Sequence, residues 1–551
     1  MMKSSTLISA CLVLAATTFL VFSQTLGFEF VNWDDDIYVY NNPLARSLST
    51  ENVGSIFSTF YYYAYIPITL LSHSVDIALW GMDARGHHLT NVILHCINTT
   101  WVFLLGLALV GVARRDILRG PHSFGSSFLT ATAPEVVGMM AGALFFGLHP
   151  LRAESAAWIS DRKDLLLLFF LLPSLLLYLQ YASQRGTPEA PRWYAGTFLF
   201  YVLAVLSKSI AIVFPVLLLM IDWLIWSKMN SRNRPASMLR GKVPFVIVSL
   251  VIAIVSLVLA PGEKVAYAVA HLEGIEQWLY PFFSLSFYLG KLVFPSPLSP
   301  LYPSGVFTDF VLGLITIICI SGLTWFLARR GNSGPLLAWF SYLVFLIPIV
   351  LGLSSGAQPI ADRYSYAATV GLCILIGGAL SQAWAIRTRS VRLLVFGGVI
   401  GLLTLLSVLT VRQSVIWKTS ETLWSSVVSQ FPPSPGILDA YVNLGTVLLE
   451  EARPDEARAL LEKAVETDPT NADAVYTLAH VLYFEGDEVG AAVAFEKVVE
   501  LDSTRSKAFF DLAVVCSRLG REEEAMISMR RAARLGLESA QEALRSRGFS
   551  W

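Results

Sequence analysis

The stretch Asp164-LLLLFFLLPSLLLYLQY-Ala182 decides the fold class of this chain. After its carboxylate it is apolar almost throughout, and it has about the length that a helix needs to cross the ~30 Å hydrocarbon core of a bilayer. Of the 551 residues, 55% are hydrophobic and 15% are charged, whereas soluble domains carry about 25% charged residues. The sequence therefore predicts an all-α, polytopic membrane protein.

Similar apolar runs follow one another as far as about residue 412. The first run follows Lys3 and fits either a cleaved signal peptide or an uncleaved span, and we favour the span because so many runs come after it. The runs occupy residues 5–22, 88–111, 132–148, 164–182, 193–207, 209–226, 243–260, 307–328, 336–353, 365–386 and 393–411.

Basic residues after alternate runs set the orientation, because cytoplasmic loops are enriched in lysine and arginine. Residues 278–294 are apolar enough to cross, but a crossing there would invert the later loops, so we interpret this segment as re-entrant or interfacial. The prediction is about eleven crossings, with the N-terminus cytoplasmic and the C-terminus exoplasmic. The basic residues are Arg114, Arg115, Arg119, Arg185, Arg192, Lys228, Arg232, Arg234, Arg240, Lys242, Arg329, Arg330, Arg387, Arg389 and Arg392.

Beyond residue 437 the chain becomes polar and repeats in windows of 34 residues, at 438–471, 472–505 and 506–539. This period is typical of tetratricopeptide repeats, in which small residues let two antiparallel helices pack closely. We expect a tetratricopeptide solenoid over 437–551 with a capping helix near 539–547, joined by a linker (413–436) to the membrane domain (1–412). Such an array normally binds a peptide or protein, and a spacer without a ligand is the alternative. The matching residues are Leu444, Leu478 and Leu512 at position 7, Gly445, Ala479 and Ala513 at position 8, Ala457, Ala491 and Ala525 at position 20, and Leu461, Phe495 and Met529 at position 24.

The first outer loop holds three adjacent carboxylates, Asp34, Asp35 and Asp36. Like charges this close repel one another, so the pKa of at least one should rise unless a cation or hydrogen-bond donors intervene. A carboxylate at a membrane surface suits a general base for an acceptor hydroxyl, or a clamp for a metal–phosphate group. A solvated acidic turn is the alternative.

The second outer loop, residues 149–164, reads HPLRAESAAWISDRKD and mixes charges of both signs. Arg162 and Lys163 are suited to hold phosphate oxygens, the first as a planar fork and the second as a point charge. The alternative is that the basic residues form salt bridges with the acidic residues of the same loop. The loop also carries His149, Glu154, Asp161 and Asp164.

Further polar residues lie at the same predicted level. Lys208 sits in the break between two runs, and Asp362-Arg363-Tyr364 opens the tenth run. Charges at such positions are candidates for function, although an Asp–Arg pair can simply neutralise itself. In the second run His88, Asn91, His95 and Asn98 share one helix face. Hydrogen bonds between helices account for such a face, and we keep His88 as a site candidate.

Five strings taken together resemble one membrane family. They are FVNWDDD (30–36), YIPITLLSH (65–73), HHLTNVILH (87–95), HPLRAESAAWISDRKD (149–164) and ADRYSY (361–366). In their order, and with the repeats behind them, they resemble bacterial relatives of the transmembrane and tetratricopeptide repeat-containing O-mannosyltransferases. The chain has about three repeats, fewer than the animal members carry.

The resemblance implies a C-type glycosyltransferase fold and an inverting transfer of a sugar from a polyprenyl-phosphate donor to a hydroxyl acceptor. Mannose and a protein acceptor follow only by analogy. Asp34 or Asp35 would be the catalytic base, with Asp36 as an extra carboxylate, and Arg162, Lys163, Lys208 and Arg363 would bind the donor phosphate. The supporting residues would be His88, His149, Glu154, Asp164, Asp362 and Tyr364.

The partners implied are a lipid-linked sugar and an acceptor protein or peptide held by the repeats, without nucleic acid. No cofactor is required beyond the donor, and a divalent cation at the carboxylates is left open. The expected location is a bacterial inner membrane, with the repeats in the periplasm.

Two rival functions fit the same residues. A non-catalytic scaffold would use the repeats to recruit a partner, and its charges would only hold the spans together. A lipid-phosphate transporter would place paired charges near the membrane midplane, whereas these charges gather at one surface. Asp34→Asn and Asp35→Asn, made singly, separate the scaffold from the enzyme.

Overall fold

The computed structural model describes residues 4–62, 64–114, 131–228, 239–259, 274–303, 305, 307–350, 358, 360–384, 386, 388–434 and 436–551. Apart from one isolated β-bridge between Tyr61 and Ala64, these residues form helices and loops. Of the predicted features, Arg115, Arg119, Arg232, Arg234, Arg387 and residues 260, 351–353 and 385 of three apolar runs lie outside this part of the chain.

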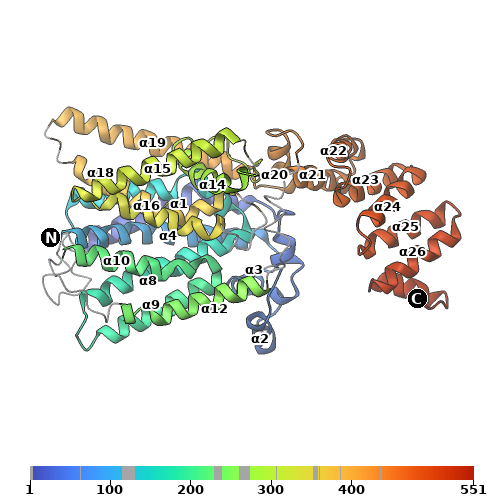
Figure 1. The fold of residues 1–551 in the computed structure, drawn as a ribbon, viewed down its shortest axis with the longest axis horizontal. Coiled ribbons are helices and arrows are strands. Elements are labelled where there is room, and N and C mark those ends of the chain that lie inside the picture. The colour runs from blue at the N-terminus through green and yellow to red at the C-terminus, as the bar shows by residue number, and fades with distance from the viewer. Residues whose placement is uncertain are drawn as a thin grey trace. The chain divides into compact units, whose positions relative to one another are not determined.

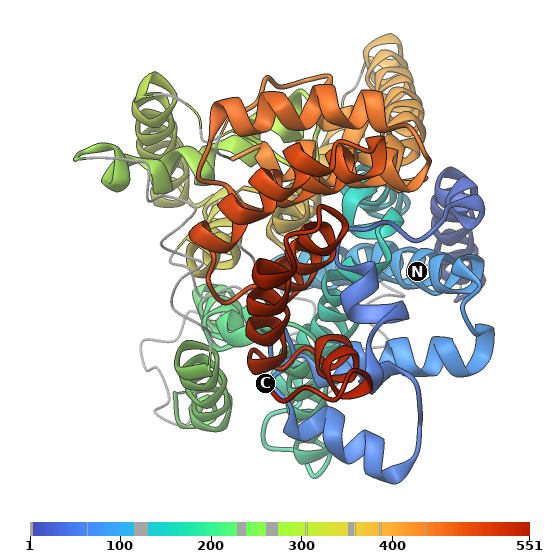
Figure 2. The ribbon, with the colours of Figure 1, turned by 90° about the vertical axis from the view of Figure 1, so that its right-hand side faces the viewer.

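The chain divides into two compact units. Unit 1 comprises residues 1–300 and 304–419, and unit 2 comprises residues 301–303 and 420–551. The long helices of unit 1 run side by side in a bundle (Figure 1), and several of them are seen nearly end-on in Figure 2. The helices of unit 1 are α1 (Ser4–Phe22), α2 (Thr50–Ser58), α3 (Pro67–Trp80), α4 (Ala84–Ala113), α6 (Ala133–Gly147), α7 (Ala153–Ala157), α8 (Arg162–Ser183), α9 (Ala190–Ser207), α10 (Phe214–Lys228), α12 (Val243–Leu259), α14 (Glu276–Val293), α15 (Phe307–Arg329), α16 (Gly334–Val350), α17 (Ser365–Ala368), α18 (Val370–Ala383) and α19 (Arg389–Val415).

Each predicted span falls on a helix, but fewer helices qualify as spans than the sequence predicted. Among the described residues, six helices are long and apolar enough to cross a membrane, or up to eight if two bent pairs each count as one span. The bent pairs are residues 133–147 with 150–157 and residues 362–368 with 370–383, each bent by 56°. The predicted spans 243–260 and 336–353 fall on shorter apolar helices, and 193–207 falls on α9. Residues 278–294 form α14, which is not one of the candidate spans.

Helices α6 and α18 pack with their backbones in contact. A Cβ atom added to Gly142 would lie 2.5 Å from the carbonyl oxygen of Cys373, and one added to Gly138 would lie 2.6 Å from that of Gly377. Small residues four apart are a common way for membrane helices to approach closely. The contact matters for function because polar segments follow the outer end of α6 and precede α18.

Unit 2 is a stack of helix pairs that begin where the repeat windows begin. The first helices of the pairs start at Leu438, Ala472 and Ser506, the first residues of the three predicted windows. The helices are α20 (Ser420–Val428), α21 (Leu438–Glu450), α22 (Pro454–Thr467), α23 (Ala472–Glu485), α24 (Glu488–Leu501), α25 (Ser506–Arg518), α26 (Glu522–Arg534) and the terminal α27 (Glu538–Ser546).

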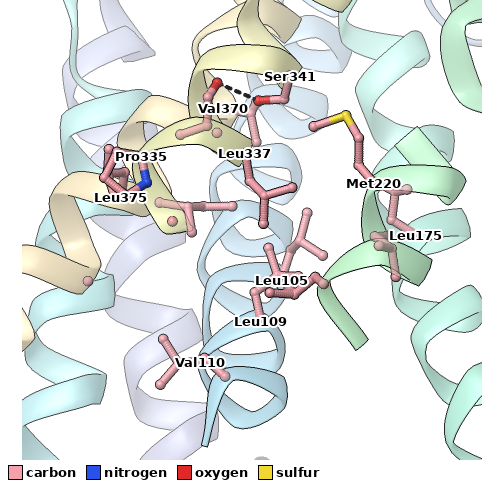
Figure 3. A pocket seen from close by; sticks show the side chains of 18 of the residues that line it. Leu105, Leu109, Val110, Leu175, Met220, Pro335, Leu337, Ser341, Val370 and Leu375 are labelled. Carbon is pink, nitrogen blue, oxygen red and sulfur yellow. Dashed lines mark hydrogen bonds between the residues drawn. The ribbon is translucent and has the colours of Figure 1, made fainter. Parts of the chain in front are cut away.

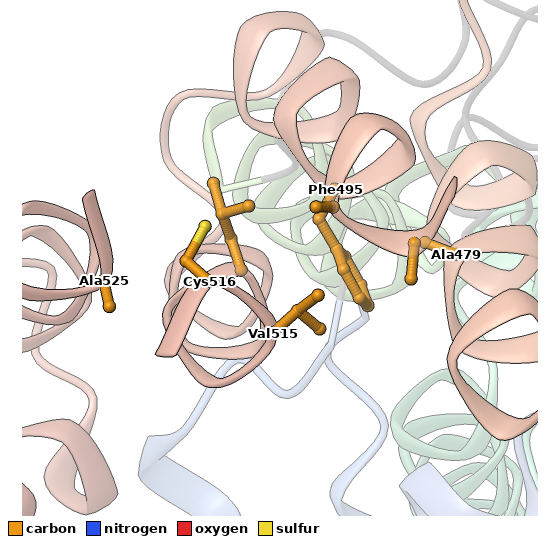
Figure 4. Packing of buried hydrophobic residues seen from close by; sticks show 8 residues of the cluster. Ala479, Phe495, Val515, Cys516 and Ala525 are labelled. Atoms are coloured by element: carbon orange, nitrogen blue, oxygen red, sulfur yellow. The ribbon is translucent and has the colours of Figure 1, made fainter. Parts of the chain in front are cut away.

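The small residues of the repeats allow the close packing that the sequence predicted. A Cβ atom on Gly445 would come within 3.0 Å of three side-chain atoms of Leu461. In the next seam, Phe495 is buried among Ala479, Val515 and other residues of neighbouring helices (Figure 4). Large residues thus fill space that small ones leave open.

The segment predicted as a linker, 413–436, is helical over about half of its length. Helix α19 continues to Val415, and α20 belongs to unit 2. The physical reason is an apolar face on α20, where Leu423, Trp424 and Val427 are buried.

Candidate active site

The first outer loop places its adjacent carboxylates in different environments. Asp34 is half-buried and has a φ of +61°, a left-handed conformation that Asp tolerates better than most residues and that often marks a functional position. Asp35 is 1% exposed. One of its oxygens accepts from the backbone N–H of Val31 (3.0 Å), and the other accepts from the N–H (3.0 Å) and Oγ (2.5 Å) of Ser160. Asp35 therefore ties the first outer loop to the second.

The predicted rise of a carboxylate pKa falls on Asp35. Burial raises its pKa from 3.8 to about 7, and the negative charge of Asp34 adds a smaller upward effect. The hydrogen bonds from Ser160 and Val31 act in the opposite direction. Burial outweighs them, because removing a carboxylate from water disfavours its charged form.

Trp158 joins the first outer loop to the cationic side chains. Its indole N–H donates to the carbonyl oxygen of Trp33 at 2.8 Å, and its ring stacks on Trp417 with centroids 5.4 Å apart. Lys163 Nζ and Arg363 Cζ lie 5.5 Å and 5.4 Å from the centre of the Trp158 ring. A buried aromatic ring in contact with two cations stabilises them through its π-face.

Arg162 is fully occupied by partners within the protein. It lies 2.5 Å from Asp76 Oδ2, and its Nε donates to Asn91 Oδ1 at 2.8 Å. Its other nitrogens donate to the carbonyl oxygens of Ser72 (3.3 Å) and His87 (3.0 Å). The predicted phosphate ligand is therefore a buried cross-link between α3, α4 and the start of α8.

Two other predicted phosphate ligands are paired with carboxylates. Lys208 Nζ lies 2.5 Å from Asp164 Oδ2. Arg363 NH1 lies 2.5 Å from Glu154 Oε1, and the backbone N–H of Arg363 donates to Glu154 Oε2 at 2.9 Å. Salt bridges thus form between the loops, and Arg363 pairs with Glu154 of the second outer loop.

Lys163 is the predicted phosphate ligand that is left without an anion. Within the described part of the chain its Nζ makes no ion pair or hydrogen bond, and it lies over the Tyr38 ring at 5.1 Å as well as over Trp158. Asp34 and Asp161 are the carboxylates that act on it electrostatically. Asp34, Lys163, Lys208 and Arg363 therefore belong to one cluster at one end of unit 1.

The supporting residues hold the surrounding segments. His149 Nδ1 accepts from the N–H of Leu151 at 3.2 Å, and its Nε2 lies 3.0 Å from the carbonyl oxygen of Leu292. Tyr364 donates to the carbonyl oxygen of Gln358 at 3.0 Å, and Lys208 Nζ lies 5.7 Å from the centre of its ring. Asp362 is buried beside Arg363, and Asp36 begins the short helical segment 36–40.

The polar face of α4 bonds to neighbouring segments, as expected for a helix face of this kind. Asn91 donates to the carbonyl oxygen of Trp158 at 3.0 Å. His95 lies 2.8 Å from the Tyr366 hydroxyl, and Asn98 donates to the carbonyl oxygen of Leu165 at 2.9 Å. His88 is buried, and its Nε2 lies 3.4 Å from the carbonyl oxygen of Glu29.

Sequence reasoning missed two carboxylates. Asp76, which anchors Arg162, lies on α3 outside every quoted string, so nothing in the local pattern indicates it. Asp161 was quoted as part of the second outer loop, yet it is fully buried and neither of its oxygens has a hydrogen-bond partner in the described structure. The available signal was its position directly before Arg162 and Lys163.

An apolar cavity of about 620 Å³ opens within the bundle (Figure 3). Its walls come from α4, α8, α10, α16 and α18, and include Leu105, Leu175, Met220, Leu337 and Val370. Leu168 and Ala367 also line it, one helical turn beyond Asp164 and Arg363 respectively. The cavity therefore begins about one turn away from the ion pairs.

Within the described residues, one group of three side chains has ligand atoms close enough to hold a metal ion. It consists of Glu496, Cys516 and Glu524 in the repeats. Arg521 binds Glu496 at 2.7 Å and also binds Glu524. Arg521 pairs with both carboxylates, so an ion-pair network accounts for this group.

Comparison with known proteins gives one match to a family model and several to relatives. A tetratricopeptide repeat model matches residues 448–488. Protein O-mannosyl-transferase F38B6.6 of Caenorhabditis elegans is 23% identical over 83% of this chain and 63% of its own length. Protein O-mannosyl-transferase TMTC1 of Homo sapiens is 23% identical over 81% of this chain and 54% of its own length. Protein O-mannosyl-transferase Tmtc2 of Drosophila melanogaster is 34% identical over 21% of this chain and 12% of its own length.

The solved structures that match include ArnT and MamA. ArnT from Cupriavidus metallidurans, bound to undecaprenyl phosphate, covers 90% of this chain and 79% of its own length at 16% identity, with a TM-score of 0.37. MamA covers 22% of this chain and 76% of its own at 19% identity, with a TM-score of 0.20. The chain spans less than two thirds of the length of the curated relatives named above. It is a distant relative of the transmembrane and tetratricopeptide repeat-containing O-mannosyltransferases.

Proposed function

We propose that this chain is a membrane glycosyltransferase that moves a sugar from a polyprenyl-phosphate donor to a hydroxyl of an acceptor protein. Mannose is the sugar that the names of its relatives point to. The proposal includes a C-type glycosyltransferase fold with about eleven crossings, a cytoplasmic N-terminus, and a site and repeats on the exoplasmic side of a bacterial inner membrane.

The observation that carries the proposal is the meeting of a charged cluster with an apolar cavity. Lys163, Lys208 and Arg363 lie together at one end of unit 1, and the cavity of about 620 Å³ begins one turn below them. A polyprenyl-phosphate sugar has an apolar chain, an anionic phosphate and a polar head, so its enzyme needs both environments side by side. A non-catalytic scaffold gives no reason for this combination.

Lys163 is the cation best placed to hold the donor phosphate. Lys208 and Arg363 each have one carboxylate partner, so those pairs are close to neutral. Lys163 has no ion pair among the described residues and lies over the rings of Tyr38 and Trp158. In such a water-poor site a single positive charge attracts phosphate more strongly than it would in water.

Asp34 is the candidate base. Both oxygens of Asp35 are occupied by donors of the protein, which suits an anchor, whereas Asp34 is half-buried beside Lys163. In the proposed step Asp34 takes the proton of the acceptor hydroxyl while that oxygen attacks the anomeric carbon from the side opposite the phosphate. The bond between the anomeric carbon and the phosphate oxygen breaks, and polyprenyl phosphate leaves with its charge beside Lys163.

The repeats would present the acceptor. Trp417 stacks on Trp158 of the site, and unit 1 ends two residues later at Thr419. The chain therefore leaves unit 1 beside the charged cluster. Tetratricopeptide arrays commonly bind extended peptides on their inner face.

The test uses the full chain in lipid nanodiscs with polyprenyl-phosphate mannose and candidate exported proteins, analysed by mass spectrometry. Asp34→Asn should lose transfer by roughly 10²–10⁴-fold and still bind the donor. The matched control is Glu51→Gln, which neutralises an exposed carboxylate of the same outer segment and should transfer normally. Unchanged glycans in cells with and without the gene, or full activity of Asp34→Asn, would favour the scaffold.

A further inference from the structure

Asp161 differs from the other carboxylates of the cluster because its oxygens have no hydrogen-bond partner among the described residues. Glu154 pairs with Arg363, and Asp164 pairs with Lys208. Asp35 accepts three hydrogen bonds. Asp161 is 0% exposed, and neither of its oxygens has a hydrogen-bond partner among the described residues. An ionised carboxylate offers about four acceptor positions, so Asp161 holds unused capacity for donors.

Its neighbours in the chain hold Asp161 in place. Ser160 is bound through its N–H and Oγ to Asp35, and Arg162 is fixed by Asp76 and Asn91. The N–H of Asp161 itself donates to the carbonyl oxygen of Trp158 at 3.3 Å. The backbone that carries the carboxylate is therefore held in place, as a site for substrate recognition requires.

The surroundings of Asp161 restrict what can satisfy it. The charged groups that act on it are Asp164, Lys208, Lys163 and Arg363. Three cations this near disfavour a divalent cation, and the carboxylate itself repels a phosphate oxygen. A neutral donor of hydrogen bonds meets neither objection. A hydroxyl group attached to the molecule whose phosphate the cations hold is such a donor.

We propose that Asp161 accepts hydrogen bonds from hydroxyl groups of the donor sugar, so that the site distinguishes a phosphosugar from plain polyprenyl phosphate. This assignment rests on the proposed function, since it takes the cationic cluster as the place of the donor phosphate. Lys163 and Asp161, two residues apart, then divide the donor between them, the first binding the phosphate and the second the sugar. Burial strengthens the discrimination, because a buried acceptor built for a hydroxyl is left unpaired by any ligand without one.

The test measures binding of two probes to the full chain in nanodiscs by quenching of tryptophan fluorescence. The probes are polyprenyl phosphate and polyprenyl phosphate carrying mannose, glucose or galactose. Asp161→Asn should weaken binding of the preferred sugar-bearing lipid by roughly 10-fold or more, while binding of plain polyprenyl phosphate stays equal or becomes tighter, because one repulsive charge is gone. Lys163→Met should weaken both probes alike.

Asp161→Asn is expected to fold, because asparagine has nearly the same size and the substitution removes no hydrogen bond to the carboxylate among the described residues. A melting temperature at or above that of the wild type checks this point. Asp161→Glu, which keeps the charge and moves it by one methylene, should lose the preference for the sugar-bearing lipid and keep the binding of plain polyprenyl phosphate. Equal losses for both probes in Asp161→Asn, or no loss for either, would overturn the assignment and leave the proposed function standing. Wild-type protein that binds neither probe would overturn the proposed function and this assignment with it.

Discussion

Replacing Asp35 by asparagine should change how the stability of unit 1 depends on pH. The pKa of Asp35 is about 7 in the folded protein and 3.8 ordinarily. Between these values the folded state binds a proton that the unfolded chain has lost, so stability falls as pH rises from about 4 to about 7 and is level above that. The full difference corresponds to about 4 kcal/mol, of which about 3 kcal/mol falls between pH 5 and pH 8.

Asparagine removes this titration and one hydrogen bond. Its amide oxygen can still accept from the N–H and Oγ of Ser160, but its NH₂ group would face the N–H of Val31, which then loses its acceptor at a cost of about 1–3 kcal/mol. At pH 8 that cost is offset by relief from burying a charge, so the variant should be nearly as stable as the wild type. At pH 5 the wild type should be clearly the more stable protein.

The assay is thermal unfolding of both proteins in the same detergent at pH 5, 6, 7 and 8. The informative quantity is the difference between wild type and variant at each pH, because the other titrating groups contribute equally to both proteins. A difference that is the same at pH 5 and pH 8 would refute the assignment of the raised pKa to Asp35. Faster hydrogen exchange at the Val31 amide of the variant would report the lost bond directly.

Three further substitutions test other parts of unit 1. Arg162→Met should destabilise the protein by about 3–5 kcal/mol, because it leaves the buried Asp76 without its cationic partner. Donor affinity measured on the folded fraction should stay unchanged, and a large loss of affinity would restore Arg162 as a phosphate ligand. Leu171→Trp narrows the apolar cavity and should raise the donor KM roughly 10-fold for long polyprenyl chains and little for a short-chain analogue. Equal effects on both donors would show that the cavity does not hold the polyprenyl chain. Gly142→Val should lower thermal stability by about 1–3 kcal/mol or more, whereas Gly398→Val, where a Cβ meets nothing within 4 Å, should not; a stable Gly142→Val would contradict the close packing of α6 on α18.

The sequence predicted the helices well because length and periodicity are local properties. Apolar runs fall on helices, and the repeat windows begin at the residues where α21, α23 and α25 begin. The number of crossings was less certain, because hydropathy does not record a bend. A 56° bend at residues 147–150 ends one run where the polar motif 149–164 begins, and a 56° bend at residues 368–370 divides another run.

The sequence identified the residue types of the site but not their partners. Arg162 and Lys163 are adjacent and both basic, yet Arg162 is bound on every side, whereas Lys163 has no ion pair in the part of the chain that the structure describes. The difference is made by Asp76, which lies far away in the sequence and is brought to Arg162 only when α3 packs near the start of α8. Tertiary contacts of this kind leave no trace in a local pattern.

The close contact of α6 and α18 has a consequence for how defects in this protein would look. With backbone against backbone at Gly142 and Gly377, the two helices cannot slide past one another by even one residue, a step of about 1.5 Å, without a collision. The segments at their outer ends carry Glu154 and Arg363, whose ion pair tolerates far less displacement than that. A bulky side chain placed at this contact, although remote from any reacting atom, would therefore be seen in an assay as a loss of the catalysed reaction.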